Sequence, residues 1–148
     1  KKDLVVLEEK NDNVEIVRAN LEDVVEYEGY DLNEIIFIVL NAHQNVSKNK
    51  YFGVGILADV LKGTVSKRIF DEKLNMVPQF GGLEKLQYEK IRAIIEWMIA
   101  EHYLLKTRGK YPVLHSTYEG LHYSESITKH KLKKLKTYLE EEVILWNL

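Results

Sequence analysis

Three consecutive side chains, Ser66, Lys67 and Arg68, have the chemistry of a phosphate-binding site. They follow an apolar stretch that ends at Gly63, and serine is a common N-cap of a helix. A helix start offers free backbone N–H groups and the positive end of the helix dipole, to which a hydroxyl and two cations add. The segment therefore predicts phosphate binding. The alternative is that Ser66 caps a helix and the two cations are solvated.

Other lysines extend this predicted site. Lys62 directly precedes the glycine that ends the apolar stretch, and Lys85 follows Gly81-Gly82 at the expected start of a long helix. Glycines let a backbone approach a ligand closely, although they also serve simply to shape a turn. Lys90 and Arg92, on the expected outer face of the long helix, are weaker candidates for the same role.

Four helices are expected to position these residues. Asp31 followed by Glu34 resembles a capping box and starts a helix over 31–44. Apolar periodicity predicts further helices over 53–61, 67–74 and 83–101. The expected core positions are Leu32, Ile35, Ile36, Val39, Leu40, Val54, Leu57, Val60, Leu61, Ile69, Phe70, Leu74, Ile91, Ile94, Ile95 and Met98.

Two short strands follow the long helix, over 103–107 and 111–115, with Arg108-Gly109-Lys110 at the tip between them. The order of helices followed by a hairpin is that of a winged helix-turn-helix. The predicted fold class is therefore α+β and mainly helical, with a β-hairpin wing and short terminal accessory segments.

The pattern resembles the RecQ C-terminal winged-helix domain (RQC) of RecQ-type DNA helicases over roughly 32–124. No single motif is specific, but their order and spacing together are fairly specific. The matching motifs are Tyr51-Phe52-Gly53-Val54-Gly55, Val60-Leu61-Lys62-Gly63, Ser66-Lys67-Arg68, Phe80-Gly81, Leu104-Leu105, Tyr111-Pro112-Val113-Leu114, and Thr117 with Gly120.

The resemblance implies a module that grips double-stranded or forked DNA at Ser66-Lys67-Arg68 without reading base edges. It also implies that the wing acts as a wedge at the fork, where Tyr111 would stack on the end base pair, flanked by Arg108 and Lys110. Alternatively, Tyr111 is a half-buried strand residue beside Pro112, and the short hairpin is a departure from efficient strand separators. The motor, with its ATP and Mg²⁺, would lie upstream in cis.

Composition excludes several functions. The 148 residues contain no cysteine, and the five histidines lack metal-ligand spacing, so we expect no disulfide, metal or cofactor in this chain. No Walker A motif or catalytic triad order is recognisable, so no catalytic residue is assigned. No apolar run is long enough for a bilayer and no signal peptide opens the chain, which favours a cytoplasmic, monomeric fragment. The start at Lys1 suggests that the fragment was cut from a longer protein that carries any cysteine-rich zinc module.

Charge divides the chain. Residues 1–34 contain 4 Lys/Arg and 11 Asp/Glu, whereas 35–148 contain 17 and 12, which together give the net charge of −2. We expect an acidic linker or accessory segment at 1–30, the winged helix at 31–124, and a basic helix or tail at 125–148. The accessory alternative pairs strands at 4–7 and 14–17 with residues 143–146.

Two rival functions remain open. A dimeric winged-helix transcription regulator would bind palindromic DNA by sequence. A protein-docking winged helix would have no affinity for nucleic acid, which the acidic net charge favours.

Overall fold

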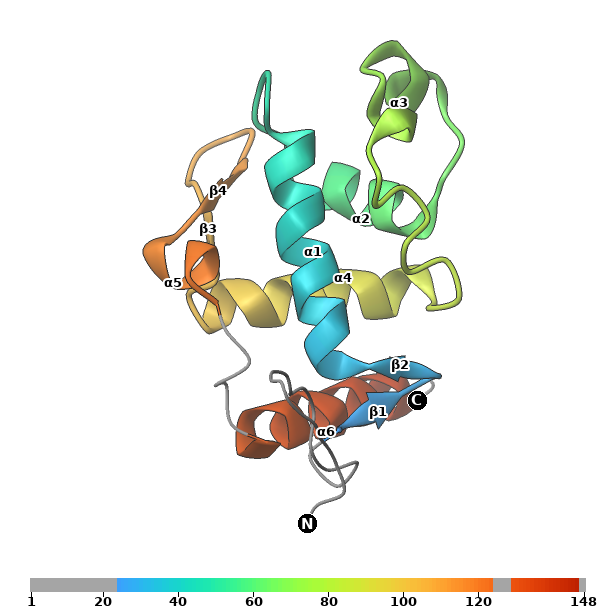
Figure 1. Cartoon of the computed structure of the whole chain (residues 1–148), viewed down its shortest axis with the longest axis vertical. Helices are drawn as coiled ribbons and strands as arrows, with labels where there is room; N and C mark the ends of the chain where they lie inside the picture. Colours follow the sequence, from blue (N-terminus) through green and yellow to red (C-terminus); the bar gives the residue numbers. More distant parts are fainter. Residues whose placement is uncertain (1–23, 124–128, 147–148) are drawn as a thin grey trace, which may run out of the picture.

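The computed structural model describes residues 24–123 and 129–146, and the strands expected at 4–7 and 14–17 lie outside them. The described chain is mainly helical with two small antiparallel hairpins, which confirms the α+β winged-helix class (Figure 1). The elements in order are β1 (Glu26–Tyr27), β2 (Tyr30–Asp31), α1 (Leu32–Val46), α2 (Val54–Lys62), α3 (Lys67–Asp71), the 3-10 helix η2 (Leu74–Met76), α4 (Tyr88–Ala100), β3 (Leu104–Lys106), β4 (Leu114–Ser116), α5 (Tyr118–Leu121) and α6 (Lys129–Trp146).

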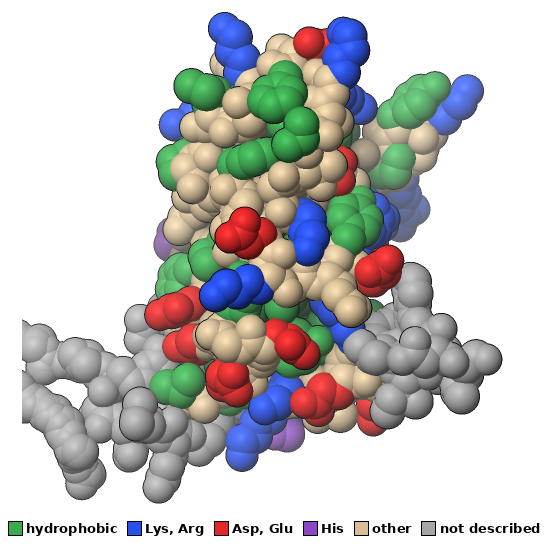
Figure 2. Space-filling model, turned by 90° about the vertical axis from the view of Figure 1, so that its right-hand side faces the viewer, with side chains coloured by type: hydrophobic (Ala, Val, Ile, Leu, Met, Phe, Trp, Pro, Cys, Tyr) green, Lys and Arg blue, Asp and Glu red, His purple; other side chains and the backbone are tan. Residues whose placement is uncertain are grey.

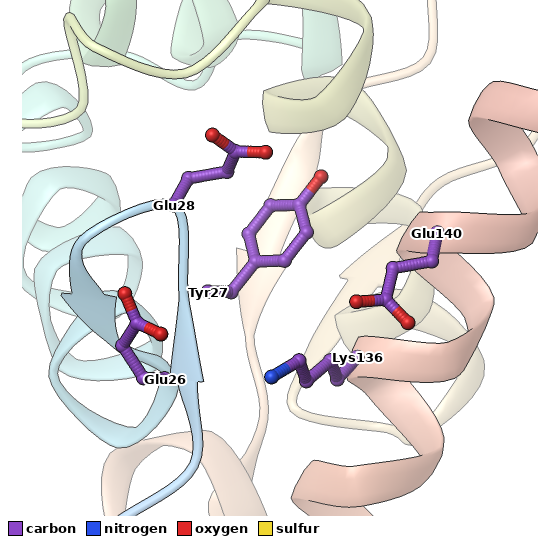
Figure 3. A pocket seen from close by; sticks show the side chains of 5 residues that line it. All are labelled: Glu26, Tyr27, Glu28, Lys136 and Glu140. Atoms are coloured by element: carbon purple, nitrogen blue, oxygen red, sulfur yellow. The ribbon is translucent and has the colours of Figure 1, made fainter.

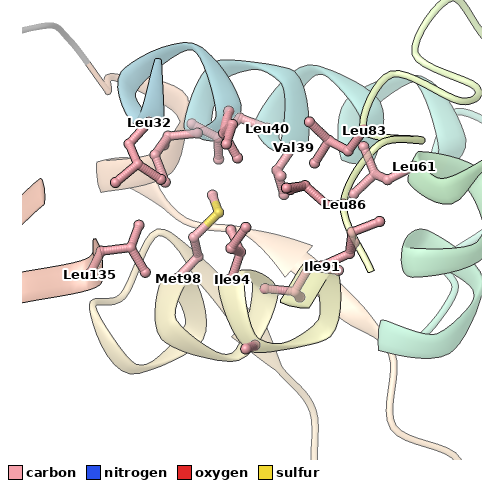
Figure 4. Packing of buried hydrophobic residues seen from close by; sticks show 14 of the residues in the cluster. Leu32, Val39, Leu40, Leu61, Leu83, Leu86, Ile91, Ile94, Met98 and Leu135 are labelled. Carbon is pink, nitrogen blue, oxygen red and sulfur yellow. The ribbon is translucent and has the colours of Figure 1, made fainter. Parts of the chain in front are cut away.

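The main core lies between α1, α2 and α4 (Figure 4). The apolar positions expected on these three helices are all buried, which confirms the periodicity argument. Asp31 caps α1 by accepting a hydrogen bond from the Asn33 amide, 2.9 Å away. Gly63 ends α2 in the left-handed conformation with a φ of 83°, which glycine adopts without strain.

The third helix is shorter than expected. Ser66 caps it, but α3 ends at Asp71 because the chain turns at Lys73, whose φ is 60°. A helix of little more than one turn buries few positions. Ile69 is buried, whereas Phe70 is 48% exposed, so the expectation that Phe70 lies in the core was wrong.

The long helix α4 begins at Tyr88, five residues later than expected. The preceding loop is held by the end of α2 instead: the Gly81 amide donates to Val60 O at 2.8 Å, and the Leu83 amide donates to Leu61 O at 2.9 Å. These bonds hold the loop backbone against the end of α2, so the loop is not helical there. Lys85 therefore lies in the loop, before the start of α4.

The wing is the hairpin β3–β4, in which Leu104 pairs with Ser116 and Lys106 with Leu114. It lies beside α1, on the opposite side of that helix from α3 (Figure 1). The expected tip, Arg108-Gly109-Lys110, lies in the loop 107–113, but the second strand begins at Leu114 and not at residue 111, where Pro112 has no N–H to donate to a strand partner.

The basic C-terminal segment forms α6, which packs against α4 and α1. Its leucines 132, 135 and 139 belong to the main core, as do Val25 and Tyr27. The helix continues to Trp146, so a strand at 143–146 is wrong and the accessory-sheet alternative fails. The division at 31 and 124 stays a prediction. No helix in the described ranges is long and apolar enough to cross a bilayer.

Candidate nucleic-acid interface

The start of α3 presents two exposed cations. Ser66 Oγ accepts from the Ile69 amide at 3.2 Å, so its capping role is confirmed. Lys67 forms an ion pair with Asp71 at 2.5 Å, but the lysine side chain is 88% exposed. The Arg68 guanidinium lies 5.7 Å from the centre of the Phe52 ring. Because α3 has only five residues, its helix dipole adds little to the positive charge of these two cations.

The other lysines of the predicted site are placed differently. Lys62 Nζ donates to Glu84 O at 2.7 Å and to Leu86 O at 2.8 Å, which ties α2 to the loop before α4. Lys85 is exposed in that loop, not at a helix start. Gly81 is close to the backbone of Gly63, so it serves the packing of this loop. The phosphate roles of Lys62 and Lys85 stay predictions.

The weaker candidates on α4 are not on its outer face. Lys90 is buried, 5% exposed, and its Nζ donates to Leu139 O of α6. Arg92 is half-buried beside Tyr88 and Gly55. A buried lysine is found where its charge is compensated, so Lys90 is a structural residue that joins α4 to α6.

The wing tip is fully open to solvent. Tyr111 is 80% exposed, which excludes the half-buried strand position. Lys110 Nζ lies 5.6 Å from the centre of the Tyr111 ring, and Arg108 is exposed on the other side of Gly109. An aromatic face with two flanking cations has the chemistry to stack on a base and contact the adjoining phosphates.

A short connecting segment, Lys50–Gly53, links α3 to the wing. Towards α3, Lys50 forms an ion pair with Glu72 at 2.7 Å, and Phe52 lies under Arg68. The segment also contacts the wing on its other side. Phe52 O accepts from the Leu114 amide at 2.8 Å, the Tyr51 ring lies 4.0 Å from that of His115, and a Cβ on Gly53 would meet Pro112 O. This segment therefore contacts both α3 and the wing.

A comparison with protein-family models identifies the family of this chain. A protein-family model, described as the RQC domain, matches residues 26–139. The chain belongs to the RQC family. RQC domains are DNA-binding modules of RecQ helicases, as the resemblance implied. A search of curated proteins finds no match.

Charge in this RQC domain is distributed unevenly. On the face shown in Figure 2, Lys and Arg side chains project from the upper end, where α3 lies, and most Asp and Glu side chains lie in the lower half, together with other Lys and Arg side chains. A hollow of about 350 Å³ lies between β1 and α6, and three of its five lining side chains are glutamates (Figure 3). It is lined by Glu26, Tyr27, Glu28, Lys136 and Glu140.

The three carboxylates of this hollow outnumber its one lysine, so its net charge is negative. Burial, followed by the negative charges of Glu28 and Glu140, raises the pKa of Tyr27. A polyanion would meet the same repulsion. No group of three or more His, Asp or Glu side chains in the described part of the chain is placed to hold a metal ion.

The sequence reasoning missed His43, which contacts the wing from α1. It is 3% exposed, and its ring nitrogens bond Leu114 O and Ser116 Oγ. Burial lowers its pKa, the hydrogen bond to Leu114 O raises it, and the nearby His115 lowers it, with a net lowering. The available signal was its position three and four residues after Leu40 and Val39, on the buried face of the helix.

Proposed function

We propose that this RQC domain grips duplex DNA through phosphates at Ser66, Lys67 and Arg68, and uses its wing at the duplex end of a fork. Arg108 and Lys110 would contact the backbone beside the fork, and Tyr111 would stack on the terminal base pair. The domain would act in cis with an ATP-dependent RecQ motor. Family membership gives the DNA-binding class, and the segment that joins α3 to the wing is the observation that carries the proposal.

The placement of these side chains supports a division of labour between α3 and the wing. Arg68 and Lys67 lie on a helix packed against the domain, where a phosphate grip is independent of DNA structure. Tyr111 lies on a projecting loop, where stacking requires an exposed base pair. Affinity for any duplex would therefore come from α3, and preference for forks from the wing.

Two substitutions test this division. Arg68→Ala is expected to weaken binding to closed circular and forked DNA alike, by about 1 kcal/mol, because one charge-assisted contact is lost. Tyr111→Ala is expected to reduce the preference for forks by roughly 1–3 kcal/mol while sparing closed circular duplex. Lys134→Ala, which removes an exposed cation from α6, is the matched control and should change neither affinity.

Fluorescence anisotropy at fixed salt gives both affinities, with the circular duplex as a competitor of a labelled fork. Equal losses on the two DNAs for Tyr111→Ala would reduce Tyr111 to a structural residue. An Arg68→Ala protein that binds as tightly as the unchanged chain would contradict the phosphate grip. In the intact helicase, Tyr111→Ala should slow unwinding more than DNA-stimulated ATP hydrolysis.

A further inference from the structure

The hydrogen bonds between the two strands of the wing are few. In the described residues β3 and β4 form a two-stranded sheet of three residues each, and such a hairpin is marginal in water on its own. Its outer edge at β4 presents backbone groups that need partners from elsewhere. How this edge is satisfied decides where the wing tip stands.

The Leu114 backbone is held on both of its polar groups. Its amide donates to Phe52 O at 2.8 Å, which is the bond that a neighbouring strand would supply. Its carbonyl accepts from His43 Nε2, 3.1 Å away, across 71 residues of sequence. The His43 ring, which comes from α1, thus donates to Leu114 O where an amide of a neighbouring strand would otherwise donate.

The protonation of the His43 ring follows from these partners. A carbonyl oxygen can only accept, so Nε2 carries the proton, and in the neutral ring Nδ1 is then the acceptor. The Ser116 hydroxyl donates to Nδ1 at 3.3 Å. One buried ring therefore bonds two of the three residues of β4, and the third, His115, lies against Tyr51.

We propose that His43 is a positioning residue for the wing, which fixes β4 against α1 so that the tip stands where a duplex end can meet it. The functional part of this inference rests on the wing role proposed above. The structural part, that the imidazole holds β4 in place, does not depend on it.

The test compares His43→Leu with His43→Gln in the 148-residue chain. Leucine fills the buried site without polar atoms, whereas glutamine keeps an N–H donor for Leu114 O and an acceptor for Ser116. Amide hydrogen exchange is measured for β4 and for Thr107, whose amide donates to Val113 O, with α4 amides as the internal reference for global opening. We expect exchange in the wing relative to α4 to rise about tenfold in His43→Leu, and to be largely restored in His43→Gln.

Fork preference is measured on the same proteins, with Tyr111→Ala alongside. His43→Leu should lower the preference for forked over closed circular DNA severalfold while keeping affinity for the closed form. If Tyr111→Ala lowers fork preference but His43→Leu does not, the positioning role fails and the wing function stands. If Tyr111→Ala has no effect on fork preference, the proposed function of the wing is wrong. Hydrogen exchange then still tests whether the His43 ring holds β4 in place.

A milder variant covers the case in which His43→Leu does not fold. Ser116→Ala removes one of the two bonds at an exposed residue. It should raise wing exchange relative to α4 in the same direction, by a smaller factor. The proposal is overturned if His43→Leu leaves the ratio of wing exchange to α4 exchange unchanged. If only Ser116→Ala folds, the same result in that variant overturns it.

Discussion

At the scale of single residues, the cations of this domain differ in what each side chain already does. Lys62 and Lys90 donate to backbone carbonyls of neighbouring elements, so their charge is committed to the fold. Lys67 is paired, but an exposed ion pair contributes little and a phosphate can compete for the lysine. The charged heads of Arg68 and Lys110 lie over aromatic rings, and both residues are exposed.

His43 gives a prediction on pH at this scale. Its folded pKa lies below the ordinary 6.5, mainly through burial and with His115 adding repulsion. Between the two pKa values the unfolded chain binds more protons, so the stability that His43 contributes is complete above pH 6.5 and falls as the pH drops through 6.5 towards the folded pKa.

Urea unfolding at a series of pH values measures this. The free energy of unfolding should fall more steeply below pH 6.5 in the unchanged chain than in His43→Leu, which has no group to titrate there. Identical slopes in the two proteins would show that His43 is not buried as a neutral ring.

At the scale of elements, the sequence predicted helices well where an apolar stripe faces the core. The bounds of α1 and α2 lie within about two residues of those expected, because both helices have a capping signal and a regular stripe. The start of α4 was missed because Leu83 has helical spacing but donates its amide to α2. Tertiary hydrogen bonds of this kind leave no periodic trace in the sequence.

The loop before α4 carries the next prediction. Lys62→Met removes two donors from Glu84 O and Leu86 O while keeping an unbranched side chain, and should destabilise the domain by about 1–2 kcal/mol. Lys85→Met is the matched control, because this exposed side chain makes no hydrogen bond within the described residues. Denaturant unfolding of both variants checks the difference, and equal stabilities would mean that water replaces both bonds without cost.

At the scale of the whole molecule, residue type offers candidates for the site but does not predict how they are joined. Ser66, Arg68 and Tyr111 stand out from their neighbours by type and by position in the predicted elements. The joining contacts connect residues far apart in the chain, such as Phe52 with Leu114 or His43 with Ser116, and no local pattern marks them. A single sequence therefore offers candidate residues, whereas only the fold shows that α3 and the wing both contact the segment Lys50–Gly53.

The proposed DNA contacts predict how the affinity for DNA depends on salt. If four cations of the basic end, Lys67, Arg68, Arg108 and Lys110, each neutralise a phosphate, the logarithm of the duplex affinity should fall with the logarithm of salt concentration with a slope of about −3 to −4, because about 0.9 counterion is released per phosphate. The double variant Arg68→Ala, Lys110→Ala should reduce this slope by about 2. Removing the exposed Lys133 and Lys134 from α6 should leave it unchanged. Titrations at several salt concentrations on random-sequence duplex measure the slopes.

A protein-docking domain would show no salt-dependent affinity. A dimeric regulator would bind a palindrome far better than random duplex and would be a dimer in light scattering. Equal slope changes from the two pairs would mean that DNA does not select the end that carries α3 and the wing.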